Sequence, residues 1–431
     1  MVERFNMPTI SALLDAIEVP FANPTLQSLY PDQGAAASRI SALINSFQSV
    51  FPGARDSFLF STPGRTEVGG NHTDHNAGRV LAAAVDLDVL ALVEPTQDGK
   101  ITVYSEGYPK VVVLTSELEM QPEERYSSSA LIRGISARLA MMGYKIGGFN
   151  ACLQSGVPKG SGLSSSAAYE VMIATILNHL YNHGKIDPLE IAVISQYAEN
   201  NFFGKPCGLM DQTTCSVGGF VTIDFKNPRQ PMVHKLNYDF SASGYALVIV
   251  ETGGDHADLN DDYAVLAAEM KSVAHALGAN VLREVSKQQV VANLAVLHGK
   301  VNDRAILRAF HFFDDDQRVA DEVFALESGQ FENFLSLVIE SGRSSWMLNQ
   351  NCYSSRNPAQ QGITLALAVS EVLLGERGAW RVHGGGFAGT IQAFVPHDLV
   401  AGYVQKMKDI FGPAACYPIS VRAAGSIQIP I

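Results

Sequence analysis

The sequence predicts an α+β fold made of two domains, on three grounds. The chain has 431 residues, which is long for one domain and comfortable for two. Hydrophobic residues make up 47% of the chain and charged residues 17%, so a large buried core can form. Strand-like and helix-like patterns are mixed in both halves of the chain, which indicates the α+β class.

The first elements expected along the chain are helices, followed by strands. Residues 1–50 are mainly helical in pattern, with a turn-rich break at 21–34. Between 58 and 113, short apolar runs alternate with turn signals such as "TQDGK", which predicts strands. Residues 127–148 have helical spacing with a glycine near the end, and residues 149–155 alternate as a strand with one solvated face does.

A buried helix and two further strands are expected next. Residues Ala167 to Tyr181 are apolar nearly all round, which is typical of a buried helix, and Gly184 is its expected stop. The runs at 218–225 and 244–254 have the apolar character of strands, and the second of them is apolar enough to be buried on both faces.

Helical patterns dominate from 259 to 375, and a last glycine cluster leads into a strand-like run at 390–396. We place the boundary between the expected domains in the region 226–243. The two domains are therefore expected to comprise residues 1–235 and 236–431.

The charge of the chain restricts the kinds of partner. The formal net charge is −12, and an acidic chain repels nucleic acid and anionic membrane surfaces at long range. The most apolar stretch, residues 80–95, is interrupted by Asp86 and Asp88, so it is expected to form buried strands and not a membrane span. We therefore expect neither nucleic acid nor membrane as a partner. An anionic substrate would have to be bound by hydrogen-bond donors at the site itself.

The cysteines and the N-terminal residues indicate the compartment. The five cysteines are odd in number and include no C-x-x-C pair, so neither a disulfide framework nor a zinc ribbon is expected. The first ten residues lack an apolar signal core. A reduced, cytoplasmic setting is therefore expected.

The stretch "VPKGSGLSSSAAYEV", residues 157–171, admits three interpretations. A flexible linker does not suit it, because a strand precedes it and a helix too apolar to be exposed follows. A serine nucleophile is disfavoured because the G-x-S-x-G pattern is absent. A phosphate-binding loop suits it best, because Gly160 and Gly162 leave backbone N–H groups accessible and the serines lie where a helix begins. An ordinary serine N-cap would need only one of the three serines.

Other nucleotide-binding motifs are absent or out of place. No G-x-x-x-x-G-K-[ST] pattern occurs, so the stretch is not a P-loop. Gly384, Gly386 and Gly389 match G-x-G-x-x-G, but a strand-like run follows them where a dinucleotide site needs a helix. We therefore do not interpret this match as a dinucleotide site.

Four motifs in order along residues 63–390 identify a family by resemblance. "PKGSGLSSSAA" resembles the ATP-binding loop of the kinase superfamily named after galactokinase, homoserine kinase, mevalonate kinase and phosphomevalonate kinase, and "GGGFAGT" resembles its C-terminal glycine motif. "PGRTEVGGNHTDHN", 63–76, resembles the N-terminal signature of galactokinases, and "AENNFFGKPCGLMDQ", 198–212, resembles their catalytic-aspartate segment. The resemblance implies a two-domain α+β small-molecule kinase with its site between the domains.

The resemblance also implies substrates, cofactors and residue roles. The expected reaction is ATP-dependent phosphorylation of galactose at its anomeric hydroxyl, with Mg²⁺, and the partners are a small sugar and ATP. Asp211 matches the base that takes the hydroxyl proton, and Arg65 matches the arginine that keeps Asp211 ionised. Ser166 and Glu199 match the Mg²⁺ ligands. The positions matching the ATP loop are Lys159, Gly160, Ser161, Gly162, Leu163, Ser164, Ser165 and Ser166. The positions matching sugar contacts are Asn71, His72, Asp74, Gly208 and Tyr263.

Without the resemblance, these residues have plainer interpretations. Asp211 could cap a helix, Arg65 could be a surface arginine after a Pro-Gly turn, and Glu199 could be a solvated helix carboxylate. His72 and His75 could suggest a metal pair, but no third ligand is apparent in the sequence.

Two features depart from the galactokinase pattern. Asn71 stands where the signature usually carries Glu, and the segment 251–270 is acidic where a basic version is usual. A kinase for a galactose derivative or for arabinose, and a sugar sensor that does not catalyse, are therefore the alternative functions.

Overall fold

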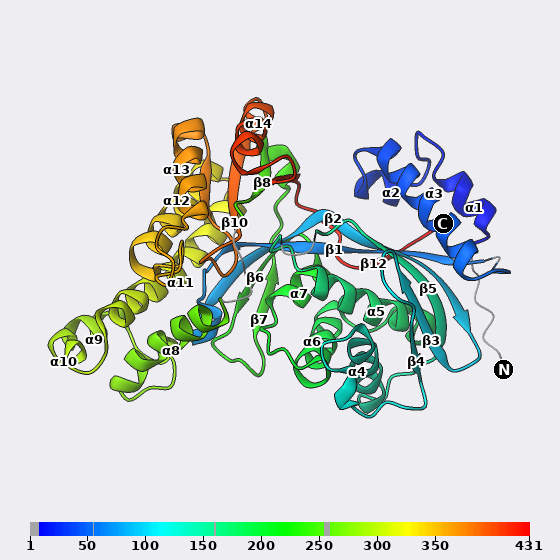
Figure 1. The fold of residues 1–431 in the computed structure, drawn as a ribbon, viewed down its shortest axis with the longest axis horizontal. Helices are drawn as coiled ribbons and strands as arrows, with labels where there is room; N and C mark the ends of the chain where they lie inside the picture. Colours follow the sequence, from blue (N-terminus) through cyan, green and yellow to red (C-terminus); the bar gives the residue numbers. More distant parts are fainter. Residues whose placement is uncertain (1–7, 55, 159–160, 254–258) are drawn as a thin grey trace.

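The computed structural model describes residues 8–54, 56–158, 161–253 and 259–431. Figure 1 shows an elongated molecule in which two β-sheets are each covered by helices. The large sheet has eight strands in the order β12-β1-β2-β5-β3-β4, with β6 on β2 and β7 on β6. Its strands are β1 (Phe58–Gly69), β2 (Arg79–Thr96), β3 (Lys100–Ser105), β4 (Val111–Leu114), β5 (Gly148–Ser155), β6 (Phe220–Asp224), β7 (Met232–Lys235) and β12 (Ile427–Ile429).

Strand β1 carries Arg65, one of the two predicted catalytic residues. It is buried along its whole length and pairs antiparallel with β2, with register shifts between Pro63 and Arg65 and between Glu67 and Gly69. Such irregularities bend a strand and redirect its side chains. Arg65 and Glu67 therefore lie at two places where the regular alternation of β1 is interrupted.

Both faces of the large sheet are covered by helices. Helices α4 (Ser128–Met141), α5 (Ser165–Asn182), α6 (Pro188–Ala198) and α7 (Met210–Val217) lie on one side, and α1 (Ile10–Ala16), α2 (Pro24–Leu29) and α3 (Gln33–Val50) on the other (Figure 1). The two-residue period of β1 explains the two cores, because Phe60 packs in the core of α5 and the adjacent Leu59 packs in the core of α3.

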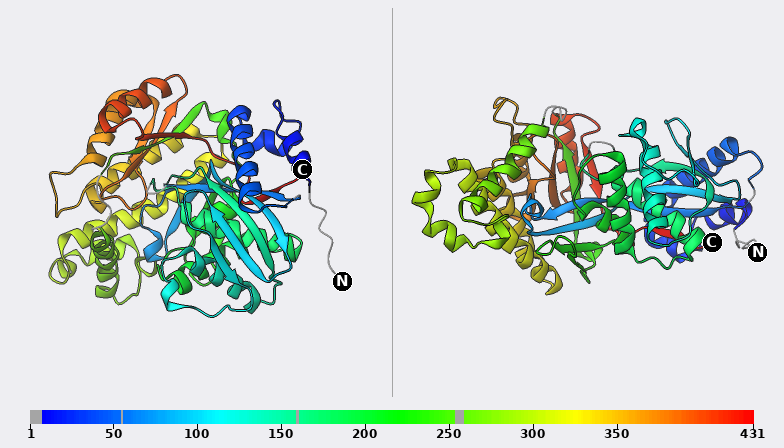
Figure 2. Two further views of the ribbon diagram at one scale, coloured as in Figure 1. Left: turned by 45° about the vertical axis from the view of Figure 1, so that its right-hand side comes forward. Right: turned by 90° about the horizontal axis from the view of Figure 1, so that it is seen from below.

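The smaller sheet contains β8 (Tyr245–Glu251), β9 (Ala379–Val382), β10 (Thr390–Pro396) and β11 (Cys416–Ile419), in the antiparallel order β11-β8-β10-β9. The remaining helices are α8 (Asn260–Ala276), α9 (Lys287–Ala292), α10 (Leu294–His298), α11 (Asp303–Glu327), α12 (Phe331–Ser344), α13 (Gly362–Leu374) and α14 (Val400–Phe411). Helices α13 and α14 cover one face of the smaller sheet, and the apolar side of α12 covers the other. Helices α8 to α10 form the end of the molecule opposite the N-terminal helices, as both views of Figure 2 show.

The structure confirms the α+β class and the expected elements at most positions. The expected helix at 127–148 is α4, and the buried helix is α5, which ends at Asn182 just before the expected stop at Gly184. The turn-rich break at 21–34 contains a short helix, α2, because Asn23 caps it and Pro24 fits its first turn. No helix in the described part of the chain is long and apolar enough to span a bilayer.

The C-terminal residues return to the large sheet. Strand β12 pairs with β1, and Val421 forms a bridge with Val85 of β2. The two sheets otherwise fall on either side of the expected boundary. The division into residues 1–235 and 236–431 stays a prediction.

Candidate active site

An ion pair between β1 and α7 lies at the centre of the candidate site. Arg65 is 9% exposed and forms a two-pronged contact with Asp211: its Nε lies 2.7 Å from Oδ1 and its Nη2 lies 2.6 Å from Oδ2. Burial raises the pKa of Asp211, but the charge and hydrogen bonds of Arg65 and a hydrogen bond from Ser164 outweigh it. The net pKa therefore lies below the ordinary value. Asp211 is thus held ionised at neutral pH.

The predicted phosphate loop is held against this pair. The Arg65 backbone N–H donates to the Leu163 carbonyl at 3.0 Å, and Nη1 of Arg65 donates to the Gly162 carbonyl. The Ser164 hydroxyl donates to Asp211. A Cβ on Gly64 would lie 2.7 Å from the Leu163 oxygen, so only glycine allows β1 to approach the loop this closely.

The loop leads directly into helix α5. Ser164 has a left-handed backbone, with φ +56°, and occupies the N-cap position, and Ser165 and Ser166 form the first turn. Ser161 and Leu163 are buried, while Ser166 is exposed at the helix N-terminus. The free N–H groups and the dipole of that terminus favour an anion. The predicted loop residues Lys159 and Gly160 lie outside the described residues.

Glu199 lies at the end of α6, in a π-helical turn from Glu199 to Phe203, and is 3% exposed. The Gln212 amide donates to Glu199 Oε2 at 2.8 Å and to Glu170 Oε2 at 3.0 Å. Within the described part of the chain, the buried Oε1 of Glu170 has no hydrogen-bond partner. Burial and the nearby Glu199 carboxylate raise the pKa of Glu170 well above its ordinary value.

Sequence reasoning missed Glu170 and Gln212. The available signals were a lone carboxylate on the otherwise apolar face of α5, four residues after Ser166, and an amide directly after Asp211.

Two of the predicted sugar contacts, His72 and Tyr263, lie together against the glycine turn near the C-terminus. His72 Nε2 contacts the Gly385 carbonyl at 2.8 Å, and the His72 ring centroid lies 6.4 Å from that of Tyr263. The Tyr263 hydroxyl donates to the Gly386 carbonyl at 3.2 Å. Burial is the main cause that lowers the pKa of His72 to about 4, so this ring is neutral at pH 7 and its Nε2 carries the donated proton.

Asp74 and Gly208 also lie together. A Cβ on Gly208 would come within 3.2 Å of Asp74 Oδ2, so the C-terminal part of the catalytic-aspartate segment packs directly on the signature motif. His75, the second histidine of that motif, is partly exposed. No group of three or more metal-binding His, Cys, Asp or Glu side chains occurs among the described residues.

Asn71 is buried inside the protein and does not lie on an accessible surface of the site. Its side chain is inaccessible to solvent, and its Nδ2 donates to Glu67 Oε1 at 2.9 Å and to the Gly384 carbonyl at 2.7 Å. Its Oδ1 accepts from Asn351 Nδ2 at 2.8 Å. A direct contact with a sugar would require one of these bonds to open, and the assignment of Asn71 as a sugar contact stays a prediction.

The glycine cluster near the C-terminus connects these parts. Gly384, Gly386 and Gly389 all have positive φ, and strand β10 follows them, as the sequence indicated. The carbonyls of this turn bond to His72, Asn71 and Tyr263. The motif therefore acts as a backbone connection between the two halves of the site.

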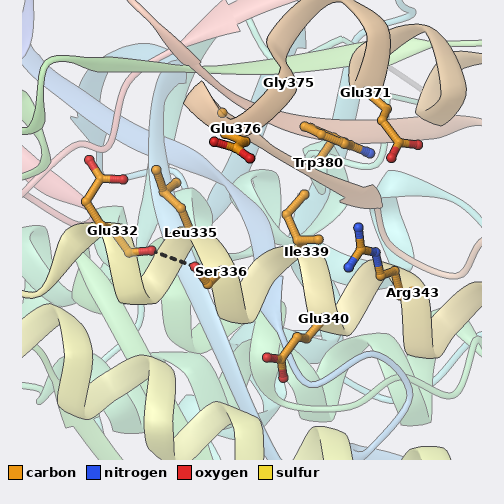
Figure 3. Close-up of a pocket in the computed structure, with 11 residues that line it drawn as sticks. Glu332, Leu335, Ser336, Ile339, Glu340, Arg343, Glu371, Gly375, Glu376 and Trp380 are labelled. Carbon is orange, nitrogen blue, oxygen red and sulfur yellow. Dashed lines mark hydrogen bonds between the residues drawn. The ribbon is translucent and has the colours of Figure 1, made fainter.

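A separate hollow lies between α12 and the segment that runs from the end of α13 to β9 (Figure 3). It has a volume of about 470 Å³ and includes Trp380, Leu335 and Ile339 together with four glutamates and Arg343. None of the predicted site residues lines it. We therefore place the candidate active site at the Arg65–Asp211 pair and not in this hollow.

A galactokinase of Streptomyces coelicolor is 30% identical over 365 residues, an alignment that covers 84% of this chain and 90% of that protein. The chain belongs to the galactokinase family.

Two family models match the segments that build the site. The galactokinase galactose-binding signature matches residues 45–95, which include Arg65 and the signature motif. The GHMP kinases N terminal domain matches residues 130–219, which include the phosphate loop, Glu199 and Asp211.

Two solved kinase structures share the fold of this chain. The galactokinase of Lactococcus lactis complexed with galactose has a TM-score of 0.77 at 24% identity, covering 90% of this chain and all of that one. The mevalonate kinase of Methanococcus jannaschii has a TM-score of 0.62 at 15% identity, covering 86% of this chain and 99% of that one. The two-sheet architecture described above is therefore the fold of this kinase superfamily.

Proposed function

We infer that the chain phosphorylates galactose at its anomeric hydroxyl, using ATP and releasing galactose 1-phosphate and ADP. The observation that supports this best is the Arg65–Asp211 pair, held directly against the phosphate loop in a member of the galactokinase family. Phosphoryl transfer depends mainly on positioning and on charge stabilisation, and this arrangement can supply both.

Asp211 is assigned to the acceptor hydroxyl. It is an ionised carboxylate with Arg65 on one side, and its side chain is 31% exposed, so a substrate hydroxyl can reach it. Because its pKa is lowered, it takes the hydroxyl proton as the bond to phosphorus forms and not beforehand. Arg65 then stabilises the negative charge on the reacting oxygens while its other donors hold the loop.

The residues present fit Mg²⁺ and the phosphates of ATP. Ser166 provides an exposed hydroxyl at a helix N-terminus, and Glu199 provides a carboxylate whose orientation Gln212 fixes through one oxygen. One hydroxyl and one carboxylate leave coordination positions for phosphate oxygens and water, as Mg²⁺ prefers. When bound, the metal would neutralise charge on the phosphates. Glu199 and Ser166 would hold it, and the N–H groups at the start of α5 would hold phosphate oxygens.

The sugar is assigned to the wall formed by His72, Asp74, Gly208 and Tyr263, with Asn71 behind it. A neutral imidazole, a carboxylate and a phenol provide the directional donors and acceptors that recognise sugar hydroxyls.

An ADP-release assay over a panel of free sugars tests this function. Purified protein with Mg²⁺ and ATP should release ADP with galactose, and much more slowly with glucose, arabinose or 2-deoxy-2-aminogalactose. Faster release with arabinose or a galactose derivative would assign a different sugar. Release with none of the sugars, by protein that binds galactose, would indicate the sensor function.

The metal assignment makes a separate prediction. Ser166→Ala and Glu199→Gln should raise the Mg²⁺ concentration needed for half-maximal activity by about 10-fold or more, since each removes one protein ligand. Titration of Mn²⁺ by electron paramagnetic resonance, with a nonhydrolysable ATP analogue present, should show the same weakening. Glu190→Gln is the matched control, because Glu190 lies on α6 and contacts Tyr144. Titrations of both site variants that overlay the parent would contradict the assignment.

A further inference from the structure

His383 is a buried histidine whose role neither the sequence motifs nor the proposed reaction explains. It follows β9 and is 2% exposed. Its backbone N–H donates to the Thr390 carbonyl at 3.1 Å. This bond fixes His383 at the base of the glycine turn, between the end of β9 and the start of β10. The side chain extends from there toward β1 and the phosphate loop.

The imidazole belongs to a chain of side-chain hydrogen bonds. The Gln392 amide Nε2 donates to Thr66 Oγ1 at 2.6 Å, which directs the Thr66 hydroxyl hydrogen toward His383 Nε2 at 3.0 Å. The other ring nitrogen, Nδ1, then carries the proton and donates to Thr390 Oγ1 at 2.9 Å. In this pattern both nitrogens of the ring and both threonine hydroxyls are satisfied.

The same ring packs against the phosphate loop. Gly162 has φ +75°, and a Cβ at that position would lie 3.0 Å from both Cε1 and Nδ1 of His383. The Gly162 carbonyl accepts a hydrogen bond from Arg65, and Thr66 is the residue after Arg65 in β1. His383 therefore contacts two neighbours of Arg65: it is hydrogen-bonded to Thr66, the next residue in β1, and it packs on Gly162, whose carbonyl accepts from Arg65.

The charge state of the ring suits this place. Burial, together with the positive charges of Arg65 and Arg381, lowers the pKa of His383 to about 3, so the imidazole is neutral at pH 7. A cation at this position would compete with Arg65 for Asp211. A neutral ring can accept from Thr66 without changing the charge balance of the pair.

We propose that His383 is a positioning residue for phosphoryl transfer, which fixes Thr66 and Gly162 so that the guanidinium of Arg65 stays aligned with Asp211. This proposal rests on the proposed kinase function. His383 acts through its neighbours, at a position provided by the C-terminal half of the chain. It thereby couples the glycine turn after β9 to the reacting groups on β1 and α7.

Two nearly isosteric variants test the proposal. His383→Gln keeps an acceptor oxygen near the position of Nε2, whereas His383→Met has a similar length and no comparable acceptor. We expect the Gln variant to retain kcat within about threefold. The Met variant should lose about 10-fold to 100-fold in kcat, because a small misplacement of catalytic groups has effects of this size. The KM for galactose should change little in either variant.

Binding and stability measurements distinguish positioning from packing. Calorimetric titration with a nonhydrolysable ATP analogue and Mg²⁺ should give weaker binding in the Met variant than in the Gln variant, because only Gln keeps the bond to Thr66 and with it the alignment of Arg65, which donates to the Gly162 carbonyl. Their melting temperatures should agree within a few degrees. If the two variants have equal kcat and equal nucleotide affinity, His383 is only a packing residue and the proposal is wrong.

Thr66→Val removes the same hydrogen bond by changing its other partner. This variant tests the proposal by itself if the His383→Met protein does not fold. It should lower kcat by about 10-fold, and its effect should not add to that of His383→Met, because both remove one contact. Fully additive effects, or an unchanged kcat in Thr66→Val, would overturn the proposal. A parent protein that phosphorylates no sugar would contradict the proposed function, whereas an active parent with equal variants contradicts only the role of His383.

Discussion

Replacing Asp211 with Asn should remove most turnover while leaving both substrates bound. The amide keeps the shape of the carboxylate and loses its basicity, and general-base catalysis contributes about 10²–10⁴-fold. The substitution also leaves the buried guanidinium of Arg65 without its counter-charge. We therefore expect kcat to fall within that range and the melting temperature to fall as well. Steady-state kinetics would measure the fall in kcat, and a calorimetric titration with galactose would show whether the sugar still binds.

Asp261→Asn is the matched control for this change. Asp261 is an exposed carboxylate paired with Arg356 on the surface, so its kinetics should match those of the parent. An Asp211→Asn protein that is folded and retains near-parental kcat would show that Asp211 is not the base.

Replacing Arg65 with Lys should have the second-largest effect. Lysine keeps the charge but cannot form the fork to both Asp211 oxygens while also bonding to the Gly162 carbonyl. Loss of one transition-state donor costs about 10²–10³-fold in kcat. Arg377→Lys is the control, because Arg377 forms an exposed pair with Asp398.

The pH profile of the Arg65→Lys variant provides an additional readout. In the proposed mechanism Asp211 acts in its ionised form, so we expect kcat/KM to be lost as the pH falls through the pKa of Asp211. In the parent, Arg65 holds that pKa below the ordinary value, so the acid limb lies at low pH. A weaker contact lets the pKa rise, and the acid limb should move to higher pH. An acid limb at the same pH as in the parent would mean that Arg65 does not control Asp211.

The residue patterns predicted the local elements of the site, but they did not predict which distant residues these elements contact. The glycines and serines before α5 indicated a phosphate loop because their chemistry is local, and the structure places that loop at the Arg65–Asp211 pair. The pairing of Arg65 with Asp211 came from resemblance alone. Hydrophobic periodicity indicates whether a residue is buried, but it does not indicate which distant segment of the chain packs against that residue.

Glu67 and Arg381 show why the remainder could not be predicted. They are 314 residues apart in sequence, yet Arg381 Nη2 lies 3.0 Å from Glu67 Oε1. Their contact depends on a bulge in β1 and on the register of β9 against β10, neither of which follows from residue patterns. The same applies to Asn351, which bonds to Asn71, and to β12, which returns to pair with β1.

Asn71 shows the limit of transferring roles by resemblance. The motif identifies the position, but the structure shows an amide bonded on three sides within the protein. Its neighbour Glu67 carries a pKa raised by burial to about 7, which Arg381 and Asn71 partly offset. The sequence alone could not show that this asparagine is part of a buried polar network.

The most direct measurement is the identity of the product. Galactose labelled with ¹³C at C1 should be incubated with ATP, Mg²⁺ and the protein, and the product examined by ³¹P NMR. The account predicts a new phosphate-ester signal that is coupled to the labelled carbon, formed in step with ADP and absent with Asp211→Asn. ADP formation without such coupling, or a phosphate on another carbon, would contradict transfer to the anomeric hydroxyl.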